Sequence, residues 1–252
     1  MLSVSAINAN NQTIKLTQSS VYQLVAITGI DPPVANIATS ELATDDGAQF
    51  NFARVPQRNI VITLQPLGNI ETARTALYAY FSPKSVVRLF LKTETRDVYI
   101  DGYVESFLAD VNANPQLIQV SIICPKPYFI DKDSTTHMIY GTEIITNDGD
   151  VSIGFQLRVN ITDTITRLDI ANSTIGYALT FQGKTLQSGD YIDINTNVGQ
   201  KDAVLTRSGE TSSMLPYMKM DSKWPILIKG DNTMFISSGN GVIGFTPQYA
   251  GL

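Results

Sequence analysis

The feature that most constrains the fold is a strict alternation of apolar with small or polar residues in the stretch "VSIGFQLRVNIT". The apolar positions are Val151, Ile153, Phe155, Leu157, Val159 and Ile161. Successive side chains of a β-strand point to opposite faces of its sheet, so this period of two predicts a strand with one buried face. A polar second face is typical of antiparallel sheets.

Shorter runs of the same character recur along the chain and predict further strands. They cover residues 22–28, 59–65, 86–92, 117–124, 177–182, 191–195 and 233–237. Turn-forming sequences such as "DDG", "NDGD", "SGD", "KGDN" and "SGNG" separate them. Many short strands with turns between them indicate sandwiches or barrels. We therefore expect a mainly β protein.

One segment, "GNIETARTALYAYFSP", has the period of a helix. Its apolar stripe consists of Ile70, Ala73, Leu77, Tyr80 and Phe81. Asn69 can cap the first turn, Glu71 suits the positive end of the helix dipole, and Pro83 ends the helix. The sequence therefore predicts a single α-helix packed against the strands.

A domain boundary is expected near residue 131. Pro125 and Pro127 in "CPKPYFIDKDSTT" cannot donate hydrogen bonds to a strand ladder, and the sequence turns polar after them. We therefore predict an N-terminal domain over residues 1–130 and a C-terminal domain over residues 131–252. The predicted helix belongs to the first of these domains.

Composition and charge exclude several classes of protein. Hydrophobic residues make up 43% of the chain and charged residues 16%, which is typical of a folded globular protein. A net charge of -5 without a basic run disfavours specific nucleic-acid binding. There is no run of 18 apolar residues, so we expect no membrane span, and the first residues lack the pattern of a signal peptide. Cys124 is the only cysteine, which excludes an intrachain disulfide.

A glycine motif near the end of the chain has the G-x-G-x-x-G spacing of dinucleotide-binding turns. It consists of Gly239, Gly241 and Gly244. The dinucleotide motif needs a helix after its last glycine, but only eight residues follow here and Pro247 is among them. We expect no cofactor. The motif instead predicts a tight hairpin at residues 239–241 and a final strand of the second domain, with Ile243 and Phe245 facing the core.

Candidate catalytic residues are few. His137, the only histidine, would have to serve any Ser-His-Asp triad, and Cys124 would be the only thiol nucleophile. Carboxylate pairs could serve glycoside hydrolysis or hold calcium. The pairs are Asp45/Asp46, Asp131/Asp133, Asp148/Asp150 and Asp190/Asp193. We interpret nearly all of these acids as turn residues and both other residues as structural, and we assign no catalytic, cofactor-binding or metal-binding residue.

Aromatic residues offer a further route to function. Trp224 and Tyr217 could stack on sugar rings, although core or interface packing is the commoner use of such side chains. A carbohydrate-binding module that acts in adhesion therefore stays open. A glycosidase or peptidase is a further hypothesis, and it depends on the paired acids and His137.

The ordered set of motifs resembles the distal tail proteins of long-tailed, non-contractile phages, the siphophage tail component family. The segments that carry this resemblance in the first half are 22–37, 45–64, 71–91, 99–107 and 119–130, and those in the second half are 179–205, 224–236 and 248–252. The resemblance implies an N-terminal β-sandwich with one helix, which forms a hexameric ring, and a C-terminal galectin-like β-sandwich.

What this resemblance implies for function is a structural hub and not an enzyme. Copies of the chain would form a homo-hexamer at the virion tail tip, after synthesis in the cytoplasm of the bacterial host. The ring would join the tail-tube protein to the tail-tip protein and to receptor-binding proteins. Residues 37–55, with Asp45, Asp46 and Gly47 at the turn, are the candidate for the extended hairpin seen in relatives. A tail-tube protein is the alternative within the same class.

Overall fold

The computed structural model of the protein describes residues 2–44 and 46–252. The chain forms two compact units. The first comprises the residues up to Lys132 together with Tyr249–Leu252, and the second comprises Asp133–Gln248. The last four residues, which the sequence analysis assigns to the second domain, therefore lie in the first unit.

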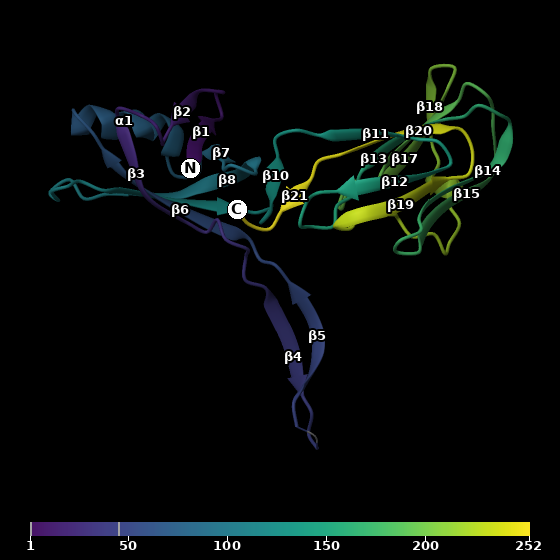
Figure 1. The fold of residues 1–252 in the computed structure, drawn as a ribbon, viewed down its shortest axis with the longest axis horizontal. Coiled ribbons are helices and arrows are strands. Elements are labelled where there is room, and N and C mark those ends of the chain that lie inside the picture. The colour runs from purple at the N-terminus through teal and green to yellow at the C-terminus, as the bar shows by residue number, and fades with distance from the viewer. Residues whose placement is uncertain (1, 45) are drawn as a thin grey trace. The chain divides into compact units, whose positions relative to one another are not determined.

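The first unit is built on one large antiparallel sheet (Figure 1). Its order is β2-β1-β7-β8-β9-β6-β3, and β10 pairs with β8 and with β21. The strands are β1 (Ser3–Asn8), β2 (Thr13–Lys15), β3 (Tyr22–Thr28), β6 (Arg58–Pro66), β7 (Val86–Lys92), β8 (Asp97–Ala109), β9 (Ile118–Cys124), β10 (Phe129–Asp131) and β21 (Gln248–Tyr249). A separate two-stranded sheet consists of β4 (Asn36–Glu41) and β5 (Ala48–Arg54).

Helix α1 (Ile70–Phe81) packs against the core of this sheet. Asn69 caps it by accepting a hydrogen bond of 3.2 Å from the backbone N–H of Thr72, as its sequence predicts. The helix ends before Pro83, and its buried side chains are Ala73, Leu77 and Phe81. Ile70 was expected on the buried stripe, but it is 44% exposed; it is the first helical residue and precedes the first buried one, Ala73, by three positions.

Helix α1 is the only α-helix in the part of the chain that the structure describes. Among these residues, no helix has the length and apolar character needed to cross a lipid bilayer.

The second unit is a sandwich of two antiparallel sheets. The six-stranded sheet has the order β11-β20-β13-β16-β17-β18, and the four-stranded sheet has the order β12-β19-β14-β15. The strands are β11 (Thr135–Ile139), β12 (Thr142–Asn147), β13 (Gln156–Asn160), β14 (Ile165–Asn172), β15 (Tyr177–Leu186), β16 (Tyr191–Asn195), β17 (Asp202–Arg207), β18 (Glu210–Ser213), β19 (Gly230–Ile236) and β20 (Asn240–Phe245). The mainly β fold class with one packed helix is confirmed.

The alternating stretch at residues 151–162 is a strand only in its second part, since β13 begins at Gln156. Its apolar positions from Ile153 onward are nevertheless buried, as the period predicts. The ladder is interrupted at Phe155, whose backbone N–H donates to Thr196 Oγ1 at 2.8 Å. Beside it, Gly154 lies so close to Asn197 that a Cβ atom there would be 2.5 Å from the Asn197 Cα.

The prediction of a hairpin at residues 239–241 is wrong. Strands β19 and β20 lie in different sheets, so the turn between them carries the chain from one sheet of the sandwich to the other. Gly239 is required there because its φ is +79° and a Cβ atom would lie 2.2 Å from the carbonyl oxygen of Asn160. The expected core positions are confirmed, since Ile243 is 0% exposed and Phe245 is 5% exposed.

Arg58 holds the returning C-terminal residues in the first unit. Its side chain is buried, and its guanidinium donates to the carbonyl oxygens of Pro127 at 2.7 Å, Gly29 at 2.7 Å and Ala250. The guanidinium also lies over the ring of Phe129, 4.5 Å from its centroid. A buried cation is stable only when its donors are satisfied, so these carbonyl groups fix the position of the chain end.

A second arginine repeats this arrangement. Arg96 donates to the carbonyl oxygen of Gly251, and its guanidinium lies 4.4 Å from the centroid of the Tyr249 ring. The hydroxyl of Tyr249 donates to Asp131 at 3.0 Å. The terminal residues are therefore an integral part of the first unit, although the whole second unit separates them from it in sequence.

Candidate functional site

The two single-copy reactive residues occupy structural positions. Cys124 is fully buried at the end of β9, and burial raises the pKa of its thiol to about 12. A thiol with so high a pKa is protonated at neutral pH and is a poor nucleophile. His137 lies in β11, and its ring stacks on Phe245 with 6.0 Å between the ring centroids.

Three of the candidate acids form ion pairs with basic residues. Asp190 binds Arg207, Asp193 binds Arg158, and Asp150 lies 3.0 Å from Lys229. Asp193 lies in the middle of β16 and Asp131 at the end of β10, so interpreting the acids as turn residues was wrong for these two. Asp46 and Asp148 are exposed, Asp133 lies outside any strand, and Asp45 lies outside the described residues.

The pKa of Asp190 is lowered, first by its hydrogen bonds from Arg207. The pKa values of Asp169 and Asp221 are also lowered, which is the opposite of what a general acid needs. No group of three or more histidine, cysteine or acidic side chains suited to a metal ion occurs in the described part of the chain.

The hairpin of β4 and β5, residues 36–54, is the most exposed element of the first unit, and we call it the arm. Its two strands pair only with each other, and Figure 1 shows it extending away from the large sheet. Every described residue of β5 is exposed. An isolated two-stranded hairpin is at best marginally stable in water.

The arm carries two exposed phenylalanines. Phe52 pairs with Ala38 and Phe50 pairs with Thr39, with Asn51 as the extra residue of a bulge between them. Adjacent residues of β4 point to opposite faces and cross-strand partners share a face, so the register places the two rings on opposite faces of the arm. They are 57% and 62% exposed. The Asn51 amide donates to Ser40 Oγ at 2.7 Å. The sequence analysis predicted this hairpin correctly, but it did not predict the bulge.

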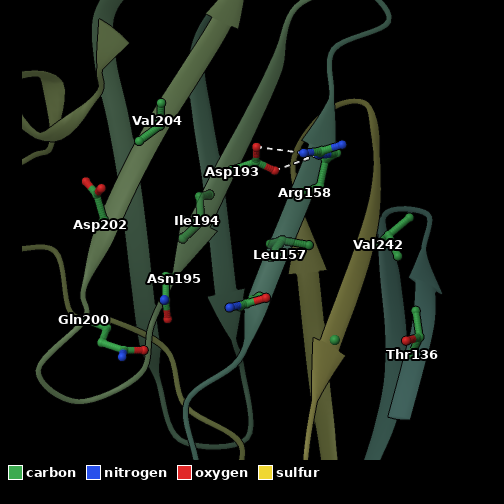
Figure 2. Close-up of a pocket in the computed structure, with 12 residues that line it drawn as sticks. Thr136, Leu157, Arg158, Asp193, Ile194, Asn195, Gln200, Asp202, Val204 and Val242 are labelled. Carbon is green, nitrogen blue, oxygen red and sulfur yellow. Dashed lines mark hydrogen bonds and ion pairs between the residues drawn. The ribbon is translucent and has the colours of Figure 1, made fainter. Parts of the chain in front are cut away.

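The outer face of the six-stranded sheet carries a second group of exposed polar residues. Arg158 in β13 and Asp193 in β16 are direct cross-strand partners, joined by hydrogen bonds of 2.6 and 2.9 Å (Figure 2). Next to them a row runs across the sheet through Thr136, Gly244, Gln156, Asn195 and Asp202. Side chains that are neighbours in such a row are about 4.8 Å apart.

The aromatic residues considered for sugar stacking do not line this face. Tyr217 and Trp224 are partly buried and pack against the core of the sandwich. Lys184 lies over the Tyr217 ring, 5.1 Å from its centroid.

Comparisons with known proteins relate the chain to phage tail proteins. Residues 148–249 match the family described as Siphovirus-type tail component, C-terminal domain. The whole chain also has the fold of a solved structure, the Dit protein of phage SPP1, described as a paradigm of the hub of the adsorption apparatus in phages that infect Gram-positive bacteria. The two structures agree with a TM-score of 0.71 at 13% identity, over 97% of this chain and 98% of that chain.

A chain of the phage P2 baseplate, in its activated conformation with Ca, is also similar. Its TM-score is 0.46 at 13% identity, over 97% of this chain and 98% of that chain. A comparison with curated proteins gives no match. The resemblance to siphophage distal tail proteins is confirmed by the family match and by the fold shared with SPP1 Dit.

The polar row on the second unit is a group of residues that sequence reasoning missed. The signal was present in the stretches that predict β13 and β16, because every second residue of a half-buried strand lies on one solvent face. Gln156 and Arg158 alternate with buried residues in β13, as Asp193 and Asn195 do in β16. Which polar residues of separate strands become neighbours depends on register, which the sequence does not show.

Proposed function

We propose that the protein is a structural hub subunit of a siphophage tail, with no catalytic role. Its copies form a closed hexameric ring through the first unit, and the second unit is a galectin-like sandwich. The family match of the second unit and the fold shared with SPP1 Dit support this proposal.

The observation that carries the proposal is the pair of exposed phenylalanines in the arm. Burying one phenylalanine side chain stabilises a protein by about 1.5–3 kcal/mol, so leaving both Phe50 and Phe52 in water forgoes a substantial stabilisation. A ring uses heterologous contacts, in which a projecting element of one subunit binds a different surface of the next. The arm is a projecting element with apolar side chains that such a contact would bury.

At the tail tip the ring joins the tail-tube protein to the tail-tip protein and provides attachment for receptor-binding proteins. Synthesis takes place in the cytoplasm of the bacterial host. The net charge of -5 and the absence of a basic run suit a passage through which DNA moves without adhering.

Light scattering of the purified protein tests the role of the arm. We expect the wild type to be hexameric, and we expect the double variant Phe50→Ser/Phe52→Ser to be monomeric because it removes both apolar anchors. Asn51→Ser is the matched control, since it changes the residue between the two rings in the same strand and leaves both rings in place. A double variant that assembles like the wild type would contradict the proposal.

A further inference from the structure

A hollow of about 740 Å³ lies on the outer face of the six-stranded sheet in the second unit. Its lining comes from five of the six strands and from the loop between β16 and β17 (Figure 2). The side chains that define it are Thr136, Gln156, Asn195, Gln200 and Asp202, with Gly244 between the first two in the row. Hollows with a few convergent polar groups are the usual form of small-ligand sites.

The polar groups of the hollow keep hydrogen-bonding capacity that the protein does not use. The side-chain amides of Gln156 and Gln200 make no hydrogen bond to any described residue. Asn195 is fixed in orientation because its Oδ1 accepts from the backbone and side-chain amides of Asn197, at 3.0 and 2.8 Å, so its Nδ2 points its donors elsewhere. Asp202 accepts from Ala203 through Oδ1 only, which leaves Oδ2 as an acceptor.

Hydrogen bonds within the protein fix the loop that contains Gln200. Thr196 is fully buried, and its hydroxyl accepts from the backbone N–H of Phe155 at 2.8 Å. The backbone N–H of Gln200 donates to Asn197 at 3.0 Å. A site whose polar groups are positioned in advance loses less conformational entropy when it binds.

The charge of the hollow indicates an uncharged ligand. The one cation that lines it, Arg158, is bound in a bidentate pair by Asp193, and its guanidinium lies 4.5 Å from the centroid of the Tyr191 ring. Asp202 is the remaining charge, and it would repel an anionic ligand. The other groups are amides and a hydroxyl, which donate to and accept from hydroxyl groups equally well.

Gly244 supplies an independent observation. Its φ is outside the left-handed region, and a Cβ atom added there would meet nothing closer than 4.0 Å. Neither backbone conformation nor packing therefore requires glycine, although glycine weakens the interior of a strand. A glycine in such a place often marks the close approach of a ligand, and here its missing side chain leaves the floor of the hollow open.

We propose that this hollow binds an uncharged saccharide. Gln156, Asn195 and Gln200 donate to and accept from the sugar hydroxyls, and Asp202 accepts from one of them. Gly244 lets the sugar ring approach the sheet. The inference rests on the second unit alone and does not depend on the proposed ring.

Saturation-transfer NMR of the full chain tests this proposal, because it detects weak binding to large assemblies. The probes are lactose, maltotriose, cellotriose and chitotriose as neutral sugars, and sialyllactose as the anionic one. We expect transfer to at least one neutral sugar and at least about tenfold weaker binding of sialyllactose than of lactose. The absence of transfer to all four neutral sugars, or equal binding of sialyllactose, would overturn the proposal.

Two variants and a control locate the binding. Gly244→Val fills the floor of the hollow with a residue that strands favour, and Gln156→Ala removes an exposed amide from its wall; each should weaken binding about tenfold or more. Gln182→Ala removes an exposed glutamine from the other sheet and should bind like the wild type. Circular dichroism and light scattering check fold and assembly separately. If both hollow variants fold and still bind like the wild type, the site is elsewhere and the proposal fails.

Discussion

The carboxylate of Asp190 shows how the acids of this chain serve structure. Asp190 is 4% exposed, and it accepts hydrogen bonds from Arg207 and from the backbone N–H of Gln187 at 2.8 Å. Because these donors satisfy the ionised form, the pKa of Asp190 lies below its ordinary value. A buried carboxylate with this environment ties the strand β17 to the turn before β16, and it is not available for proton transfer.

This ion pair predicts a dependence of stability on pH. The pKa of Asp190 is lower in the folded state, so its contribution to stability is present above the unfolded-state pKa of about 3.9 and is lost as the pH falls through the folded-state value. We expect Arg207→Met to lower the free energy of unfolding at pH 7, with the difference from the wild type closing below about pH 4. Urea unfolding at several pH values measures this.

Lys201→Met serves as the control, because it removes the same charge from an exposed side chain. Its difference from the wild type should be small at every pH. A loss of stability in Arg207→Met that stays constant down to about pH 3 would show that Asp190 does not gain from its partner.

At the scale of elements, helix α1 provides a local test. Asn69→Ala removes the acceptor for the Thr72 N–H, and we expect it to lower the free energy of unfolding of the first unit by about 1 kcal/mol. Thr75→Ala, at an exposed position of the same helix, should leave stability unchanged or raise it slightly, because alanine has the higher helix propensity. Equal losses in the two variants would contradict the assignment of the cap.

Local sequence predicted most elements of the fold for a physical reason. The capped helix, the arm and strands such as β3, β7 and β16 follow from periodicity and turn residues within a few positions of each other. The predictions failed where contacts with residues distant in sequence determine the local structure. Gly154 and Phe155 leave the predicted strand because residues 196–197 lie against them, and the turn after β19 connects two sheets because of where their partner strands lie.

The candidate surfaces were predictable to a smaller extent for the same reason. The position of the arm follows from a local turn, but the faces on which its two phenylalanines lie depend on a bulge opposite Ala38 and Thr39 that shifts the register. The hollow depends on the alignment of β20, β13, β16 and β17, whose register is set by pairing between distant segments.

At the scale of the whole molecule, the chain returns to its first unit after completing the second. No local pattern in residues 248–252 indicates this, because the partners of these residues are Arg58, Arg96 and the loop at residues 29–32. The sequence analysis therefore placed the end of the chain in the second domain.

Removing Tyr249–Leu252 tests the contribution of this return. The truncation deletes the acceptors that Ala250 and Gly251 provide for two arginines, and we expect it to destabilise the first unit by about 3 kcal/mol. Hydrogen exchange monitored by mass spectrometry measures the effect in each unit separately. Exchange should become faster in residues 86–92 and remain unchanged in residues 156–160. Unchanged exchange in both segments would contradict this role of the C-terminal residues.

The central claim is that copies of this chain close into a ring, which the exposed arm makes possible. Negative-stain electron microscopy of the purified protein tests it most directly, because rings, tubes and monomers differ in outline. We predict isolated closed rings with sixfold symmetry. Long stacked tubes would indicate a tail-tube protein instead, and a field of monomers at high protein concentration would contradict the claim.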